Sequence, residues 1–250
     1  MPRVLAVANQ KGGVAKTTTA AALSTAFAQA GRRVLLVDLD PQACLTFALG
    51  VDADEVVTSS AEVLLGAPLE DAVVRTAEDV DLLPATLELA ATDAALVARP
   101  DREAALRDAL APVADRYDDV VVDCSPTLGV LTLAALAAAD EVLVPLAAEM
   151  LGHRAVGQLL DTAEDVRRGV NPGLVVVGLL PTMVDLRTSH AREVVEDLSG
   201  RYGLPVLGPV PRSVRVAEAP VRGRSVLTTS PRSRASLAYR EVATELLHGR

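Results

Sequence analysis

The chain has 250 residues, half of them hydrophobic, and a formal net charge of −9 from 24 basic and 33 acidic side chains. This composition excludes a disordered or low-complexity chain, and the length suffices for a complete hydrophobic core. The two cysteines, Cys44 and Cys124, exclude a disulfide framework and a four-thiolate zinc site, and we expect both to be small buried residues. No hydrophobic run is long enough to span a bilayer, and the amino terminus lacks the features of a signal peptide, so we expect a cytoplasmic protein.

Short, nearly continuous hydrophobic runs alternate with longer helix-like stretches along the chain. Such runs are typical of strands covered on both faces of a parallel sheet. The alternation predicts one doubly wound, mostly parallel sheet with helices on both faces, in a single α/β domain over residues 1–250. The predicted strands are Val4–Ala8, Val34–Val37, Val120–Val122, Val142–Leu146, Leu174–Leu180 and Val206–Val210. The predicted helices are Thr18–Ala30, Asp101–Tyr117, Leu128–Ala138, His153–Arg168, Ser189–Tyr202 and Ser233–His248, and 51–83 is the least regular stretch.

The first predicted strand runs into a glycine-rich segment, NQKGGVAKTTT, at residues 9–19. A strand, a glycine-rich loop and a helix N-terminus in this order present backbone N–H groups and the positive end of the helix dipole to an anion. Gly12 and Gly13 would let the backbone approach phosphate oxygens. Lys16 would reach the β- and γ-phosphates, and the Thr17 hydroxyl would bind Mg²⁺. The segment therefore predicts a nucleoside triphosphate site, the alternative being a simple turn into a helix.

Lysine occurs only at Lys11 and Lys16, both in this segment, whereas the other 22 basic residues are arginines. This bias indicates that both positions need a compact ammonium group rather than a planar guanidinium.

The loop departs from the common phosphate-loop pattern G-x-x-x-x-G-K-[ST], because Gln10 and Ala15 occupy both glycine positions. It resembles instead the deviant Walker A motif K-G-G-x-x-K-T-T of the ParA/MinD group of ATPases. The resemblance implies an ATPase with ATP and Mg²⁺ as cofactors, in which Lys11 reaches the nucleotide of a partner subunit. The nucleotide contacts that it implies are Lys11, Gly12, Gly13, Val14, Ala15, Lys16, Thr17 and Thr18. Ala15 replaces the usual glycine, and its Cβ disfavours a positive φ, so we expect weaker ATP binding or a rearranged loop.

Acidic residues follow two of the predicted strands. Asp38 and Asp40 lie in a segment that resembles the switch of this family, and Asp123 follows a strand that resembles its Walker B strand. Ligands of open α/β sheets bind at the carboxyl ends of the strands. The resemblance implies that Asp40 activates the attacking water, with Lys11 and Lys16 as the other catalytic residues. It also implies that Asp38 and Asp123 join Thr17 around the metal. The alternative for Asp38 and Asp40 is a helix cap.

Two later segments, 181–188 and 211–220, resemble motifs of the Soj branch, the chromosomal ParA type. That resemblance implies that the backbone around Pro211 and Arg212 flanks the adenine base. Residues 201–250 hold nine arginines against three acids, and such a basic end can bind DNA phosphates. The implied DNA contacts are Arg187 and Arg215, and charge clustering adds Arg222, Arg224, Arg232 and Arg234. The alternative is a solvated arginine-rich surface.

Together, the resemblance implies a homodimer with ATP sandwiched at the interface, non-specific DNA binding, and slow hydrolysis stimulated by a ParB-type protein. Such a protein would act in chromosome or plasmid partitioning and would associate with the nucleoid when ATP is bound. Three alternatives stay open: a MinD-like membrane-associated ATPase, a metabolic ligase or kinase on the same scaffold, and an orphan ParA-like regulator. A membrane ATPase needs an amphipathic C-terminal helix, but 236–250 contains no Phe or Trp. We expect that helix to pack against the domain and expect no stable membrane association.

Overall fold

The computed structural model describes residues 1–147, 153–185, 187 and 189–249. Over these residues, seven strands form one sheet in the order β3-β4-β2-β5-β1-β6-β7, parallel except for the β3–β4 pair. The strands are β1 (Arg3–Val7), β2 (Val34–Leu39), β3 (Val74–Arg75), β4 (Asp81–Leu83), β5 (Asp119–Cys124), β6 (Glu141–Ala147) and β7 (Val175–Thr182). The predicted fold class, a mostly parallel α/β sheet, is confirmed.

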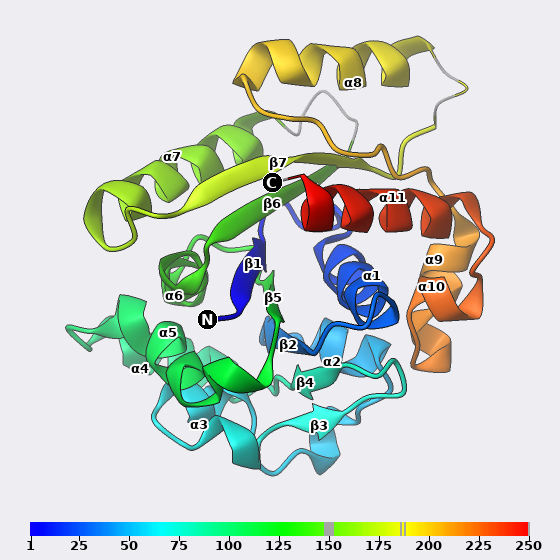
Figure 1. The fold of residues 1–250 in the computed structure, drawn as a ribbon. Coiled ribbons are helices and arrows are strands. Elements are labelled where there is room, and N and C mark those ends of the chain that lie inside the picture. Colours follow the sequence, from blue (N-terminus) through cyan, green and yellow to red (C-terminus); the bar gives the residue numbers. More distant parts are fainter. Residues whose placement is uncertain (148–152, 186, 188, 250) are drawn as a thin grey trace.

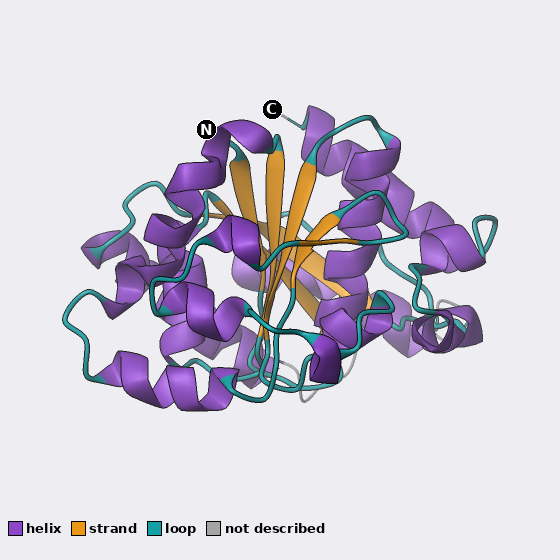
Figure 2. Ribbon diagram, turned by 90° about the horizontal axis from the view of Figure 1, so that it is seen from below, coloured by secondary structure: helices purple, strands orange, loops and turns teal. Residues whose placement is uncertain are grey.

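Helices cover both faces of this sheet and bury two separate hydrophobic clusters against it (Figures 1 and 2). One face carries α1 (Lys16–Gln29), α2 (Cys44–Ala48), α9 (Val214–Glu218), α10 (Val226–Thr229) and α11 (Arg234–His248). The other carries α3 (Ser60–Leu64), α4 (Leu89–Val97), α5 (Ala105–Leu110), α6 (Val130–Ala138), α7 (His153–Gly169) and α8 (Ser189–Tyr202). Short 3-10 turns complete the order: η1 (Ala53–Glu55), η2 (Leu69–Asp71), η3 (Arg102–Ala104), η4 (Ala111–Arg116) and η6 (Pro220–Arg222).

Two predicted elements are wrong. Residues 206–210 form no strand. They make the isolated bridge Leu179–Val206 and a few backbone hydrogen bonds beside β7, but Pro209 has no N–H to donate and Gly208 has a positive φ of 81°. The predicted helix 101–117 breaks into α5 and flanking 3-10 turns, since Pro112 cannot continue an α-helix. The short strands β3, at the edge of the sheet, and β4, next to it, were also missed, in the stretch that looked least regular. Their hydrogen bonds to neighbouring strands, rather than a long hydrophobic run, define them.

The register of the sheet brings the sequence motifs together at its carboxyl edge. Val7, the last residue of β1, lies opposite Asp123 of β5, and Asp123 lies opposite Asp38 of β2. The loop after β1 and both carboxylates therefore meet at one place, where α1 begins.

Candidate functional site

The loop after β1 is held by two polar side chains, its own Asn9 and Thr182 of β7. Asn9 donates from Nδ2 to the Pro145 carbonyl at 2.7 Å, and its Oδ1 accepts from the Lys11 N–H at 3.0 Å. From β7, the Thr182 hydroxyl donates to the Val14 carbonyl at 3.0 Å. The loop is thus fixed at both ends before any ligand binds. The roles of Asn9 and Thr182 were missed from the sequence, where their one signal is a polar residue at the end of a buried strand.

Two residues of this loop have left-handed backbone conformations, Gly13 with φ 72° and Ala15 with φ 63°. A Cβ on Gly12 or Gly13 would meet no protein atom within 4 Å, so packing does not require glycine at either position. Ala15 is the N-cap of α1 and has no side-chain oxygen with which to cap the helix. The N–H groups of the first turn of α1 therefore lie beside the loop without a capping side chain from Ala15, an arrangement suited to an anion.

Ala15→Gly is expected to stabilise the protein, because a left-handed alanine costs roughly 1–2 kcal/mol, only partly offset by the backbone entropy of glycine. We expect a net gain of up to about 1 kcal/mol, measured by chemical denaturation, together with tighter nucleotide binding. Ala28→Gly, inside α1, is the matched control and should destabilise by about 1 kcal/mol. Equal destabilisation by both substitutions would contradict the strain at Ala15.

Lys16 lies under the loop, with 7% of its surface exposed, and its Nζ donates to the Lys11 carbonyl at 3.2 Å. Burial lowers its pKa, against the opposing charges of Asp123 and Asp40. Lys11 is half-buried and therefore more exposed than Lys16. The two lysines thus differ in burial.

Asp123 is fully buried, and neither carboxylate oxygen has a hydrogen-bond partner among the described residues. Burial and the charge of Asp38 raise its pKa well above the usual range, although the nearby Thr17 hydroxyl and Lys16 ammonium lower it. A buried carboxylate without partners is costly and needs an explanation. Carboxylate and hydroxyl oxygens beside a phosphate loop are the ligands that Mg²⁺ prefers, so Asp123 and Thr17 fit this metal.

Asp38 is also fully buried, but hydrogen bonds occupy both of its oxygens. Oδ1 accepts from the Asp40 N–H at 3.1 Å, and Oδ2 accepts from the N–H and the hydroxyl of Thr46 at 2.9 and 2.7 Å. Burial still raises the pKa of Asp38 to about 6. Asp40 is half-buried, and its Oδ1 accepts from the Gln42 N–H at 3.0 Å. Of the three site carboxylates, Asp123 is thus the one with both oxygens buried and unpartnered.

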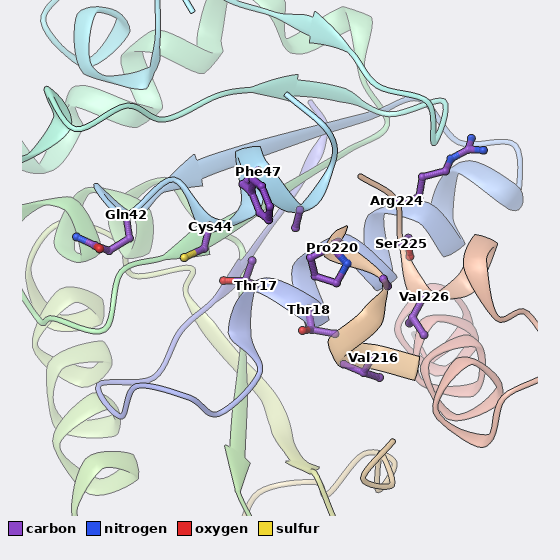
Figure 3. Close-up of a pocket in the computed structure, with 13 residues that line it drawn as sticks. Thr17, Thr18, Gln42, Cys44, Phe47, Val216, Pro220, Arg224, Ser225 and Val226 are labelled. Atoms are coloured by element: carbon purple, nitrogen blue, oxygen red, sulfur yellow. The ribbon is translucent and has the colours of Figure 1, made fainter. Parts of the chain in front are cut away.

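A pocket of about 420 Å³ opens beside the first turn of α1, between α2 and the α9–η6 segment (Figure 3). Thr17 and Thr18 form one wall, and Phe47 of α2 faces Pro220 across the opening. Cys44 also lines this pocket and is exposed, which corrects the prediction that it is buried, whereas Cys124 is buried as predicted. Hydrophobic side chains dominate the lining, so the pocket can accept an apolar group next to the phosphate loop.

The segment predicted to flank adenine lies close to the loop. Pro211 forms a parallel bridge with Val184, whose carbonyl accepts from the Arg212 N–H at 3.1 Å. Val184 follows Thr182 by two residues, and Thr182 binds the loop at Val14. A short chain of contacts therefore connects Pro211 and Arg212 to the phosphate loop.

The arginines predicted to contact DNA differ in their environments. Arg187 pairs with Asp185 at 2.7 Å, and Arg215 of α9 pairs with Glu218 at 2.8 Å, all four side chains being largely exposed. Arg222 is exposed, as are Arg232 and Arg234. Arg224 instead binds Glu78, a buried acid that also accepts from the Ser225 N–H at 3.1 Å. Arg224 thus joins the β3–β4 turn to the segment before α10.

Known proteins similar to this chain were found by sequence and by structure. A family model described as an AAA domain matches residues 2–176. The chain is 39% identical over 249 residues to the sporulation initiation inhibitor protein Soj of Bacillus subtilis, covering 98% of each chain. It is 42% identical over 250 residues to the chromosome partitioning protein ParA of Caulobacter vibrioides, covering 98% of this chain and 94% of that one. A solved structure of cobyrinic acid a,c-diamide synthase from Mycobacterium smegmatis, with an ATP analogue and magnesium, is 50% identical, with TM-score 0.89 over 100% of this chain and 98% of that chain.

Proposed function

Because the chain belongs to the ParA/Soj family of partitioning ATPases, we propose that it is a dimerising ATPase that binds DNA non-specifically in its ATP state and acts in chromosome or plasmid partitioning. The observation that carries the proposal is the buried carboxylate of Asp123, without a hydrogen-bond partner in the part of the chain that the structure describes, beside a phosphate loop and a helix N-terminus that has no side-chain cap. Relatives named for partitioning, and a structural neighbour with a bound ATP analogue and magnesium, support it.

ATP is proposed to bind with its phosphates on the loop of residues 11–18 and its adenine beside Pro211 and Arg212. Lys16 would then donate to phosphate oxygens instead of the Lys11 carbonyl. Burial disfavours the charged form of this ammonium, so a negatively charged partner would stabilise it. Thr17 and Asp123 would hold Mg²⁺. Within the described residues no group of three or more His, Cys, Asp or Glu could hold a metal ion, so phosphate and water oxygens would complete the shell.

Asp40 is proposed to orient the water that attacks the γ-phosphate, since it is half-buried at the carboxyl edge of the sheet. The family resemblance implied that Asp38 lies in the metal shell. Because both of its oxygens already accept hydrogen bonds from the chain, we give it a supporting role behind Asp40 instead.

Lys11 is proposed to cross the dimer interface to the nucleotide of the partner subunit. Lys11→Arg is therefore expected to lower turnover about tenfold or more, because a guanidinium cannot occupy the position of a compact ammonium. ATP binding to the monomer should change little, whereas Lys16→Arg should impair binding itself. Titration of a fluorescent ATP analogue and steady-state kinetics separate these effects. Unchanged turnover in Lys11→Arg would show that the restriction of lysine to two positions is coincidence.

The DNA-binding surface is proposed to consist of Arg187, Arg215 and Arg222, without Arg224, which is engaged with Glu78. Arg215→Glu should weaken DNA binding and reduce the slope of log affinity against log salt by about 1 per subunit. Glu218→Gln should strengthen binding, because it releases Arg215 from its ion pair. Arg33→Glu, an exposed change just before β2, is the control and should have little effect. Filter binding over a salt series measures all three, and equal losses in Arg33→Glu and Arg215→Glu would refute this surface.

The membrane alternative receives no support from α11. Its Val242 and Leu246 are buried against α1 and the sheet, as predicted for a helix that packs on the domain. No helix among the described residues has the length and hydrophobicity to cross a membrane.

A second candidate, ATP-dependent amide synthesis, is favoured by one observation, the name of the structural neighbour that is 50% identical. That reaction needs a carboxylic acid substrate and an ammonia source, and it would consume ATP only when both are present. DNA would have no effect on it.

The proposal is tested by ATP turnover of the protein alone, with DNA, with a candidate ParB-type protein, and with both. We expect slow basal turnover that rises when both are present. Stimulation by neither would favour the orphan regulator. ATP consumption that requires a carboxylic acid and ammonia would favour the synthetase.

A further inference from the structure

Thr46, in the short helix α2, is fully buried, and its hydroxyl makes two hydrogen bonds in opposite roles. Oγ1 donates to Asp38 Oδ2 at 2.7 Å and accepts from the Ala85 N–H at 2.9 Å. Ala85 follows the strand β4, which pairs with β2. One side chain therefore connects the segment after β4 to the carboxylate at the end of β2.

The same carboxylate continues the connection to Asp40. Asp38 Oδ1 accepts from the Asp40 N–H at 3.1 Å, and the Asp40 carbonyl accepts from the Ala43 N–H at 2.8 Å. Ala43 is the N-cap of α2, has φ 49°, and has no side-chain oxygen to cap the helix. Asp38 takes over that task, because its Oδ2 also accepts from the Thr46 N–H at 2.9 Å. The backbone of residues 40–46 is thus arranged around one buried carboxylate.

We propose that Thr46 is a positioning residue for ATP hydrolysis, acting through Asp38 on Asp40. The inference rests on the proposed function, in which Asp40 orients the attacking water. Without the Thr46 hydroxyl, Asp38 loses its one side-chain donor and the buried Ala85 N–H loses its acceptor. The Asp38 carboxylate is then held only by the backbone N–H groups of Asp40 and Thr46 among the described residues, which allows it to shift relative to Asp40. A displacement of about 1 Å in a group that orients water costs about a hundredfold in rate.

The alternative is that the Thr46 network only anchors α2. Anchoring would alter stability and nucleotide affinity, whereas positioning alters kcat through Asp40 alone. The two therefore differ in a double-mutant cycle with Asp40→Asn.

Thr46→Val removes the hydroxyl at nearly constant volume, and Thr46→Ser keeps it. Thr25→Val is the matched control, because Thr25 is also buried, with a hydroxyl that donates to the Ala21 carbonyl within α1. The measurements are kcat and KM for ATP, the affinity for an ATP analogue, and the thermal midpoint. Each is repeated in the Asp40→Asn background. Should Thr46→Val not fold, Thr46→Cys, whose thiol is a weak donor, takes its place.

We expect Thr46→Val to lower kcat at least about tenfold with analogue affinity nearly unchanged, Thr46→Ser to restore most of it, and Thr25→Val to leave kcat unaltered. In the Asp40→Asn background, Thr46→Val should cause no further loss. A kcat equal to that of wild type in Thr46→Val, or losses that multiply in the double variant, would overturn the inference while leaving the proposed ATPase intact. Absence of turnover in the wild-type protein would overturn both.

Discussion

Asp123→Asn is expected to raise the unfolding temperature of the ligand-free protein while abolishing Mg²⁺-dependent ATP hydrolysis. The wild-type carboxylate is buried, has no hydrogen-bond partner among the described residues and lies opposite Asp38 in the sheet. A neutral amide of the same shape removes the cost of that charge, about 2 kcal/mol or more. For a chain of this length, such a gain corresponds to roughly 4–8 °C. The wild-type protein would thus be less stable than this variant because it keeps a charge that binds the metal.

The pH dependence of this gain follows from the direction of the pKa shift. Burial raises the pKa of Asp123 in the folded state, so the folded protein binds the proton more tightly than the unfolded chain does. The destabilisation by the ionised Asp123 is therefore absent below about pH 4, the pKa of aspartate in the unfolded chain. It grows as the pH rises through the higher pKa of Asp123 in the folded protein. The advantage of Asp123→Asn should be full at high pH and vanish near pH 4.

Asp119→Asn is the matched control, at the other end of β5. Asp119 is as buried as Asp123 but forms ion pairs with Arg3, at 2.7 Å, and with Arg32. Breaking these pairs should destabilise the protein by about 3 kcal/mol. Thermal melts from pH 4 to 8 compare the two variants. Destabilisation of the ligand-free protein by Asp123→Asn at pH 8 would contradict our description of this carboxylate.

Asp40→Asn is expected to lower ATP turnover by about 10²–10³-fold while ATP binding is retained. Asparagine keeps the size of the side chain and the acceptor for the Gln42 N–H, but it cannot accept a proton from water. Because hydrolysis ends the ATP state, this variant should also remain on DNA longer than the wild type. Single-turnover kinetics and DNA dissociation rates measure both effects.

Asp54→Asn is the control for that variant, because Asp54 is an exposed acid in the 3-10 turn η1, which follows α2. It should hydrolyse ATP at the wild-type rate. Equal turnover in Asp40→Asn and the wild type would remove Asp40 from the reaction, and with it the basis for the role of Thr46.

Much of the fold could be predicted because the central strands are buried on both faces. Residues 119–124 are all buried, and the hydrophobic run Val120–Val122 within them predicted a strand that the structure confirms. The failures have local causes. Pro209 and Pro112 interrupted patterns that were otherwise hydrophobic or helical, and β4 has only three residues, too few for a periodic signal.

The candidate site could likewise be predicted only in part. From the sequence, the Cβ of Ala15 was expected to disfavour a positive φ, but Ala15 has a φ of 63° in the structure. The predicted strand ends located Asp38 and Asp123. They did not predict that both oxygens of Asp38 accept hydrogen bonds while those of Asp123 have no partner among the described residues. The hydrogen bonds to Asp38 come from Asp40 and Thr46, and the Thr46 hydroxyl is itself held by the Ala85 N–H, 47 residues from Asp38. Single hydrogen bonds of this kind leave no periodic pattern in a sequence.

The central claim, that ATP controls DNA binding, is tested most directly by measuring the affinity for non-specific DNA at one moderate salt concentration with ATP, with ADP and without nucleotide. Two subunits that close around ATP double the phosphate contacts of one surface. We predict binding at least about tenfold tighter with ATP than in the other two states, with the difference retained in Asp40→Asn and lost in Lys11→Arg. Equal affinity with and without ATP would contradict the proposed switch.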